Sequence, residues 1–378
     1  MNAICKLMLS GASAAAMLVT GCASNTASSS SGTHDVTQTA TPTITATSTG
    51  AQNGAKIVTL ADADSGAKIF YTVDGSTPTT SSPVYNTPFL VARTETINAV
   101  ALVTADRQSE VATQTITLTI PSGTLVWSDE FDQASTANVS PSSSTWTYDT
   151  GAGGWGNSEL ETYCAAASST SPCSSSSPNA YVSTDGNLHI EALNPSSGVY
   201  TSARMKTTGL FSFQYGRAEV RAKLPVGQGL WPAFWLLGNN YGAQGWPAGG
   251  ELDVMEHIDA QSPDWVAGSI HGTGFDGSTD YYLTSGDSVA EWHTYGMIWQ
   301  KGSVSFYVDN PANIYATYSA SSYTASGQRW PFDNGQSAFM LLNLAVGGSW
   351  PGNPDSSTVF PAEMLVDYVR IYTNTDDN

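Results

Sequence analysis

The chain has 378 residues, of which 12% are charged and 10% aromatic, and it carries a formal net charge of −19. Such an acidic protein is a poor match for nucleic acids and for anionic polysaccharides, because like charges repel. Gly, Ser and Thr are abundant and no long apolar stripe has helical spacing, so the sequence predicts an all-β protein with room for two domains behind a leader.

Residues 1–21 are predicted to be an export signal: Lys6 precedes an apolar run, residues 7–19, that is too short to span a membrane. The run ends in Gly21 before Cys22, which resembles the box at which bacterial lipoproteins are acylated. We therefore expect a lipid on Cys22, with an ordinary secretory signal as the alternative. The expected location is the outer membrane or cell surface, or else the periplasm or medium, with membrane contact only through the lipid.

Residues 22–40 are rich in Ser and Thr and predict a flexible linker. Residues 41–120 then show short alternating strands separated by turns. Ile69–Val73 runs into Asp74–Gly75, a strong hairpin signal, and residues 96–103 alternate again. This region predicts a small β-sandwich.

Residues 71–78, followed by residues 82–85, resemble the fibronectin-like domain that is appended to chitobiases and other secreted glycosidases. The resemblance implies a spacer or a module that contacts carbohydrate. We favour the spacer, because the segment has no evident row of exposed Trp residues.

Residues 124–375 form the second predicted domain, which begins after Pro121–Gly123. Its strand-like runs are six to ten residues long and end at Gly, Asn, Asp or Pro, as in residues 216–223, 303–308 and 364–372. An antiparallel sandwich of two sheets fits this pattern and this length.

The most informative segment of this domain is Glu251–Glu256, which places three carboxylates in an apolar run. Glu251 and Asp253 share one face of a strand, and a β-bulge would return Glu256 to that face. Three carboxylates on one face are costly unless a site uses them. Glycoside hydrolysis needs such a set, because a nucleophile and an acid/base ~5–5.5 Å apart give retention at the anomeric carbon.

A solvated strand edge or a calcium loop could also carry three carboxylates. A solvated edge would mix Lys or Thr with the acidic residues, whereas the intervening residues here are Leu252, Val254 and Met255. A calcium loop would present consecutive ligands with Gly rather than a hydrophobic alternation. The pattern therefore favours a glycosidase site.

Cys164 and Cys173 flank a Ser-rich loop, and export makes a disulfide between them the favoured state. The histidines show no spacing typical of metal ligands, which disfavours a zinc site.

Many segments between residues 124 and 375 together resemble the laminarinase-like branch of glycoside hydrolase family 16. The resemblance implies a β-jelly-roll (concanavalin A-like) sandwich whose concave face forms an open cleft. The segments that carry it are residues 125–131, 154–163, 200–204, 216–219, 229–235, 251–256, 342–352 and 366–370.

The resemblance also implies site residues. Glu251 matches the family nucleophile, Glu256 the general acid/base and Asp253 the residue between them. The predicted sugar-binding residues are Asn157, Arg204, Trp231, Trp235, Trp246, His271, Asn343 and Trp350. The alternative for Arg204 is a structural ion pair with Glu159 or Glu161.

No cofactor is expected for catalysis. Many family members carry a structural Ca²⁺, and the matching positions here are the carbonyls of Glu130 and Gly186 and the side chain of Asp367. The alternative for Asp367 is an ion pair with Arg370 or a turn cap.

The expected partner is a neutral β-1,3-glucan, because the segments that should line the cleft hold no Lys or Arg and only Arg204 is placed beside them. The expected enzyme is monomeric. Alternatives are a galactan or mixed-linkage glucan hydrolase on the same fold, a carbohydrate-binding surface lipoprotein without activity, or an adhesin that uses residues 41–120.

Overall fold

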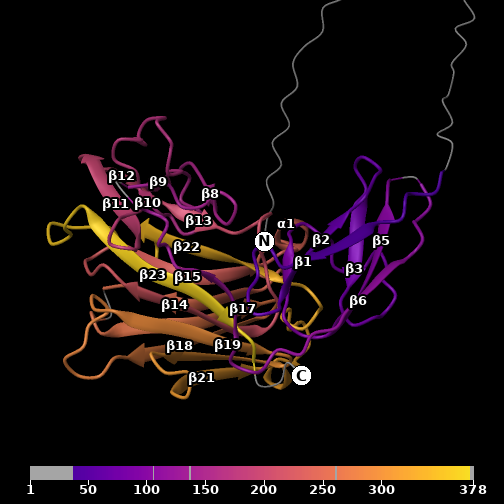
Figure 1. Cartoon of the computed structure of the whole chain (residues 1–378). Coiled ribbons are helices and arrows are strands. Elements are labelled where there is room, and N and C mark those ends of the chain that lie inside the picture. Colours follow the sequence, from indigo (N-terminus) through magenta and orange to yellow (C-terminus); the bar gives the residue numbers. More distant parts are fainter. Residues whose placement is uncertain (1–36, 105, 136–137, 260–261, 375–378) are drawn as a thin grey trace, which may run out of the picture. The chain divides into compact units, whose positions relative to one another are not determined.

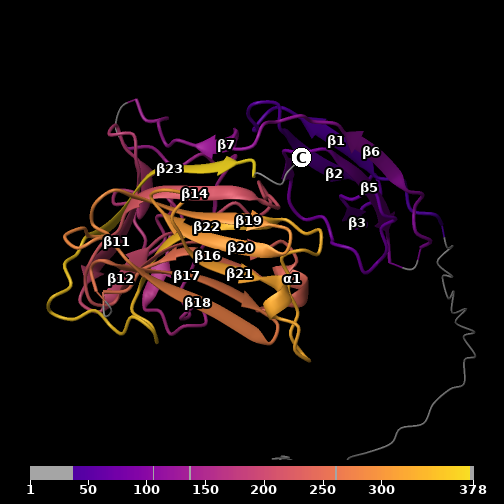
Figure 2. The same cartoon turned by 90° about the horizontal axis from the view of Figure 1, so that it is seen from below.

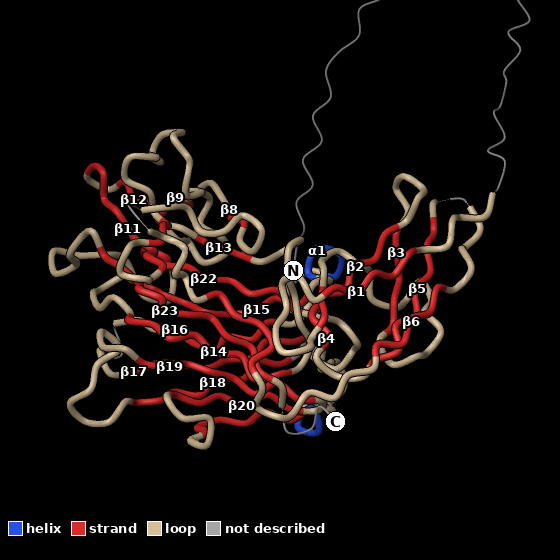
Figure 3. Tube along the Cα trace, viewed as in Figure 1, coloured by secondary structure: helices blue, strands red, loops and turns tan. Residues whose placement is uncertain are grey.

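The computed structural model describes residues 37–104, 106–135, 138–259 and 262–374. The signal, Cys22 and most of the linker lie outside these ranges. Figure 3 shows that the described chain is almost entirely strand and loop, which confirms the all-β prediction. Within the described ranges the helical elements are α1 (Tyr241–Gln244) and the 3-10 turn η1 (Ala320–Ser322).

The small N-terminal domain is a sandwich of two three-stranded sheets (Figure 1). Alternate residues of each strand point into a shared core that includes Val58, Tyr71 and Ile97. One sheet holds β1 (Thr43–Thr47), β2 (Lys56–Ala61) and β4 (Phe89–Val91), and the other holds β3 (Lys68–Thr72), β5 (Glu95–Leu102) and β6 (Ala112–Ile116).

The larger domain stacks a seven-stranded sheet on a ten-stranded one. The seven-stranded sheet runs β18-β17-β16-β15-β22-β13-β8. Its strands, in chain order, are β8 (Thr147–Asp149), β13 (Arg204–Lys206), β15 (Leu230–Gly238), β16 (Glu251–Glu256), β17 (Trp265–Gly272), β18 (Phe275–Tyr282) and β22 (Ala338–Val346).

The ten-stranded sheet runs β21-β20-β19-β14-β23-β11-β12-β9, with β10 paired to β11 and β7 paired to β23 (Figure 2). Its strands are β7 (Leu125–Asp129), β9 (Glu161–Tyr163), β10 (Ala180–Val182), β11 (Leu188–Ser196), β12 (Val199–Ser202), β14 (Gly216–Lys223), β19 (His293–Gln300), β20 (Ser303–Val308), β21 (Ile314–Ser319) and β23 (Ala362–Tyr372).

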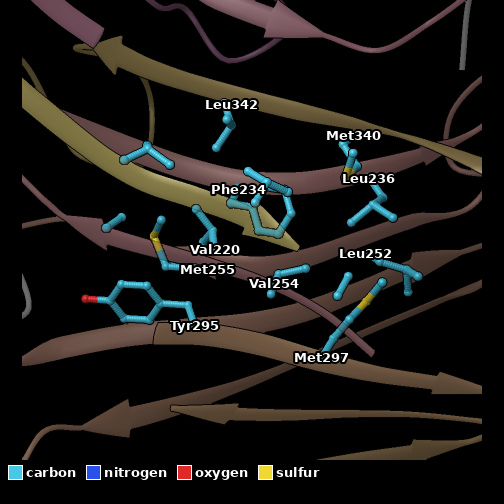
Figure 4. Close-up of a cluster of buried hydrophobic side chains, with 14 of the residues drawn as sticks. Val220, Phe234, Leu236, Leu252, Val254, Met255, Tyr295, Met297, Met340 and Leu342 are labelled. Atoms are coloured by element: carbon cyan, nitrogen blue, oxygen red, sulfur yellow. The ribbon is translucent and has the colours of Figure 1, made fainter. Parts of the chain in front are cut away.

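The core lies between these two sheets. Figure 4 shows side chains of β15, β16 and β22 meeting Val220, Tyr295 and Met297 from the opposite sheet. Every second residue of β15 is therefore taken up by packing, and the residues between them point to the other side of the seven-stranded sheet. We call that other side the outer face.

Gly268 on β17 is needed for the two sheets to approach each other beside β16. A Cβ at this position would lie 2.5 Å from the hydroxyl of Tyr315 and 2.8 Å from the ring of Phe306, both on the ten-stranded sheet. Because both rings are packed in the interior, neither can move away cheaply.

We expect Gly268→Ala to lower the free energy of unfolding by about 1–3 kcal/mol, the usual cost of overpacking. Thermal denaturation followed by circular dichroism measures the change. Gly242→Ala is the matched control, since nothing lies within 4 Å of a Cβ there. Equal melting temperatures for the two variants would contradict this account of the core.

Candidate active site

Strand β16 contains the predicted bulge. Its register with β15 shifts between Phe234 and Trp235, which lie opposite Met255 and Asp253, so Val254 is the extra residue. The register with β17 shifts in the same stretch. The backbone thus uses two successive residues where the partner strand uses one.

The bulge decides which way the carboxylates point. Val254 and Met255 are adjacent in sequence, yet both pack into the core beside Leu252 (Figure 4). Glu256 therefore returns to the outer face that Glu251 and Asp253 occupy. All three carboxylates gather on one face of one strand, as predicted from the sequence.

His271 on β17 joins this cluster. Its Nε2 lies 3.1 Å from Asp253 Oδ2 and 3.8 Å from Glu251 Oε1, and its Nδ1 lies 2.8 Å from Asp276 Oδ1. Burial opposes protonation, but the hydrogen bonds and charges of these carboxylates raise the pKa of His271 to about 10. The imidazolium supplies a positive charge inside the acidic cluster.

The pKa of each of the three carboxyl groups is raised, and the neighbours that act on each group differ. Burial, followed by the charge of Asp253, raises the pKa of Glu251, while His271, a hydrogen bond from Trp246 and Arg204 oppose the rise. Burial and the charges of Asp253 and Glu251 raise the pKa of Glu256, while His271 and a hydrogen bond from Trp231 oppose the rise. Burial also raises the pKa of Asp253, against His271.

Trp231, Trp265 and Trp350 form an aromatic group beside Glu256. The indole of Trp231 donates a hydrogen bond of 3.1 Å to Glu256 Oε1. Trp350 meets Trp231 and Trp265 edge to face, with ring centroids 5.1 and 5.8 Å apart, and remains 40% exposed. An exposed indole supported by two others offers a flat apolar surface.

Trp246 lies at the Glu251 side of the cluster. It is 58% exposed, and its ring centroid is 5.9 Å from that of His271. The candidate carboxylates are thus flanked by exposed indoles in two places, which suits a ligand with apolar faces.

Trp235, Arg204 and Asn343 come together on the neighbouring strands. The indole of Trp235 donates to Asn343 Oδ1 at 2.7 Å, and the guanidinium of Arg204 lies 4.7 Å from the centre of the Trp235 ring. Arg204 also lies 5.3 Å from the ring of Trp155, so it is held between two indoles.

The ion-pair partner of Arg204 is Asp149 on β8, at 3.1 Å, and not Glu159 or Glu161, the alternative that the sequence left open. The β8–β13 register explains the pair, because it sets Arg204 opposite Asp149. Lys206, two residues on, pairs with the same carboxylate. The sequence placed Arg204 as the one basic side chain beside the cleft. In the structure Lys206 shares its carboxylate partner and lies beside it as well.

Asn157 lies in the loop before β9. Its side-chain amide donates to Glu159 at 3.1 Å, and its carbonyl accepts a hydrogen bond of 2.7 Å from the Ser349 amide, next to Trp350. The loop that holds Asn157 is therefore bonded to the loop that holds Trp350.

One of the three predicted calcium ligands, the side chain of Asp367, has another partner in the structure. Asp367 accepts a hydrogen bond from Arg221, whereas Arg370 binds both oxygens of Glu130 at 3.0 and 2.7 Å. The alternative pair between Asp367 and Arg370 is not formed. The guanidinium of Arg221 would compete with a hard cation for the Asp367 carboxylate, and the structural calcium ion stays a prediction.

Glu251, Asp253 and His271 offer ligand atoms that all lie within 4.8 Å of one another, which could in principle hold a metal ion. Both nitrogens of His271 face carboxylates, however, and a protonated imidazole has no lone pair for a metal. We therefore treat this group as an acidic cluster with its own counter-charge.

Cys164 and Cys173 form the predicted disulfide. The predicted lipidation of Cys22 falls outside the described residues. Neither helical element of the described ranges has the length and apolarity needed to cross a bilayer.

Sequence reasoning missed several residues at this site. Asp276 orients His271, Asp149 holds Arg204, Trp155 covers Arg204, and Trp265 supports Trp350. Two of them had a local signal: Trp155 stands beside Asn157 in a segment that carries the family resemblance, and Asp276 lies opposite His271 across a short hairpin. Asp149 and Trp265 depend on which strands become neighbours.

The sequence matches the family model for "Glycosyl hydrolases family 16" over residues 168–370, more than half of the chain. The chain belongs to glycosyl hydrolases family 16. A second model, "Chitobiase/beta-hexosaminidase C-terminal domain", matches residues 47–115 in the small sandwich. Both family resemblances seen in the sequence are thereby confirmed.

Individual relatives agree with this family. A beta-glucanase of Rhodothermus marinus is 38% identical over 67% of this chain and 86% of its own length. Glucan endo-1,3-beta-glucosidase A1 of Niallia circulans is 34% identical over 66% of this chain, but the match spans only 37% of that longer protein.

A solved structure is also similar. The catalytic domain of an endo-1,3-beta-glucanase (laminarinase) from Thermotoga petrophila superposes with a TM-score of 0.59 at 37% identity. The match covers 68% of this chain and 100% of that domain. The jelly-roll prediction is thus confirmed.

Proposed function

We propose that the protein is a retaining endo-β-1,3-glucanase that hydrolyses neutral, laminarin-type glucan by double displacement. The observation that carries this proposal is the bulged strand β16, which sets Glu251 and Glu256 on one face with different electrostatic neighbours. Membership of the family and the similarity to glucanases support it.

In the first step, Glu251 acts as the nucleophile. Its carboxylate attacks the anomeric carbon, and the His271 imidazolium and the Trp246 indole favour its ionised form. Glu256 starts protonated, the form that its raised pKa favours, and donates its proton to the glycosidic oxygen as the C–O bond breaks. The sugar is left joined to Glu251 by an ester bond.

In the second step, Glu256 acts as the base. Now a carboxylate, it takes a proton from a water molecule, whose oxygen attacks the anomeric carbon and breaks the ester. Glu251 is released as a carboxylate. Two successive inversions give net retention, so the β-linkage yields a β-product.

Asp253 lies between the two groups and is 4% exposed. Its charge raises the pKa of both Glu251 and Glu256, and His271 balances that charge. We assign Asp253 the role of setting the protonation of the pair, with His271 and Asp276 holding it in place.

The outer face suits an uncharged sugar. Trp246 and Trp350 present exposed indoles for the apolar faces of pyranose rings. We assign hydroxyl contacts to the amides of Asn157, which is exposed, and Asn343, which is 6% exposed and accepts the bond from Trp235. Arg204 and Lys206 are both paired with Asp149. Neither cation is left over for a sulfate, which would need its own Arg or Lys.

We expect purified enzyme to release short oligosaccharides from laminarin, with the β-anomer appearing first by NMR. Mixed-linkage glucan, agarose and carrageenan are the comparison substrates. Faster cleavage of agarose or carrageenan than of laminarin would favour the galactan alternative, and an α-anomer as first product would contradict double displacement. Binding without cleavage would indicate a carbohydrate-binding protein.

Glu251→Gln and Glu256→Gln are each expected to lower kcat by about 10²–10⁴-fold or more while laminarin still binds, since each removes a group that reacts. Asp253→Asn should cost less. Glu291→Gln is the matched control, because its side chain is 74% exposed and its ion-pair partner, Lys223, is 3.6 Å away. Steady-state kinetics measures all four variants, and near-normal turnover by either of the first two would overturn the assignment.

The structural calcium ion stays a prediction of the family resemblance, and binding it requires Asp367 to leave Arg221. We expect a chelator to lower the melting temperature while activity at moderate temperature holds, because the positions lie on the opposite sheet. Asp367→Asn should remove the chelator's effect. An unchanged melting curve after chelation would argue against a bound ion.

We further propose that the protein is an exported monomeric lipoprotein of the outer membrane or cell surface, anchored through Cys22. The expected effect of Cys22→Ser is release from the membrane fraction into the soluble fraction, measured by cell fractionation and immunoblotting. Cys164→Ser is the control, since it changes a cysteine that the disulfide already occupies. A variant that still sediments with membranes would show that another segment anchors the chain.

A further inference from the structure

A second pair of buried carboxyl groups lies near Asn343, and the proposed mechanism does not use it. Glu161 on β9 is 0% exposed and Glu159, just before β9, is 8% exposed. Carboxyl groups are almost never fully buried without partners. The pair therefore needs an explanation of its own.

Glu159 begins a chain of hydrogen bonds that leads to the outer face. Its Oε2 accepts a hydrogen bond of 3.0 Å from the Tyr163 hydroxyl, which in turn accepts one of 3.3 Å from the side-chain amide of Asn343. The same Asn343 accepts the bond from Trp235, and Glu159 Oε1 accepts the bond from Asn157. Glu159 is thus the common anchor of the two asparagines proposed to bind sugar.

Glu161 ties the same loop to β22. Its Oε2 accepts a hydrogen bond of 2.7 Å from the amide of Val346, and the amide of Leu160 donates to the Val346 carbonyl at 2.8 Å. Oε1 of Glu161 is buried and meets no hydrogen-bond donor within the described residues. The side chain of Glu159 also interacts with the Glu161 carboxyl group, both by its charge and as a hydrogen-bond partner.

Two carboxylates in contact in the interior cannot both be ionised at low cost. A proton on Glu161 removes the problem, because the carboxyl group then donates to Glu159 through the oxygen that otherwise has no partner. The other charged or titratable groups nearby are Tyr163 on the same strand, Tyr200 opposite on β12, and Arg204 on β13, which Asp149 already neutralises.

We propose that Glu161 is a positioning residue that works as a protonated carboxyl group, joined to Glu159 by its proton so that Asn157 and Asn343 are held for sugar binding. The role rests on the proposed glucanase function. Burial, followed by the charge of Glu159, raises the pKa of Glu161 to about 8. The proton therefore stays at neutral pH and is lost in mildly alkaline solution.

The raised pKa of Glu161 makes the stability of the folded state depend on pH. The folded state binds the Glu161 proton more tightly than the unfolded chain does. The stability this group contributes is complete below its unfolded pKa, near 4.5, and falls as pH rises toward the folded value of about 8. Sugar binding should weaken as pH passes that folded value, since ionisation separates the two carboxyl groups.

Glu161→Gln is the decisive variant, because an amide can accept from Val346 and donate to Glu159 but cannot ionise. Binding of laminaritetraose is measured by calorimetry in the inactive Glu251→Gln background, which separates binding from turnover. We expect the dissociation constant of the Glu161-containing protein to be about tenfold higher at pH 9 than at pH 7, the change set by a pKa near 8. With Glu161→Gln the value at pH 7 should be retained and this alkaline rise should be absent.

Melting temperature against pH provides a second readout that does not depend on sugar. Relative to Glu161→Gln, the protein with Glu161 should lose stability between about pH 5 and pH 8. Glu291→Gln serves as the matched control and should leave both profiles unchanged. Tyr163→Phe keeps the ring but breaks the link to Asn343, so it should raise the dissociation constant at every pH.

Parallel profiles with and without Glu161→Gln in both measurements would overturn the proposal. So would a loss of binding at pH 7 in a Glu161→Gln protein with a normal melting temperature, because an ionised carboxylate would then be required. Failure of the proposed function gives a different pattern: no binding of laminaritetraose by any protein, with the stability difference still present.

Discussion

The cost of burying negative charge governs the organisation of this protein. Strand β16 turns three carboxylates toward one face, and each of them is wholly or partly withdrawn from water. A lone buried carboxylate neutralises itself by a rise in pKa rather than stay charged. The groups that oppose this rise differ between the two glutamates: Trp246 and Arg204 act on Glu251, and Trp231 acts on Glu256.

The bulge in β16 also avoids burying a carboxylate in the core. A regular strand would bury Glu256 in the core and expose Met255, at the expense of both hydrophobic packing and solvation. One extra residue lets Val254 and Met255 fill the core in succession and returns Glu256 to the outer face. Core packing thus stabilises the catalytic geometry. A shift of register would remove Val254 and Met255 from the core and would also turn Glu256 away from the outer face.

The distribution of the few basic residues follows from this constraint as well. His271 forms an ion pair with Asp253 on β16, and both Arg204 and Lys206 form ion pairs with Asp149. The Glu159 and Glu161 pair has no cation of its own among the described residues, so a shared proton takes its place. Unlike the charge of an arginine, this proton is lost in mildly alkaline solution, so the loop before β9 becomes sensitive to alkali.

The sequence alone determined the all-β class, the two domains expected within the chain, and the carboxylates of β16 with their bulge. These features are local, because alternation, turn residues and a break in alternation are properties of neighbouring residues. The disulfide could also be expected, since its cysteines are close in the chain. Tertiary structure alone decided the partners: Asp149 for Arg204, Arg221 for Asp367, Asp276 for His271, and Tyr163 between Glu159 and Asn343. The contact between Asp276 and His271 spans a short hairpin. The ion pairs of Arg204 and Asp367 and the link from Tyr163 to Asn343 join strands far apart in the sequence, which become neighbours only when the whole core packs.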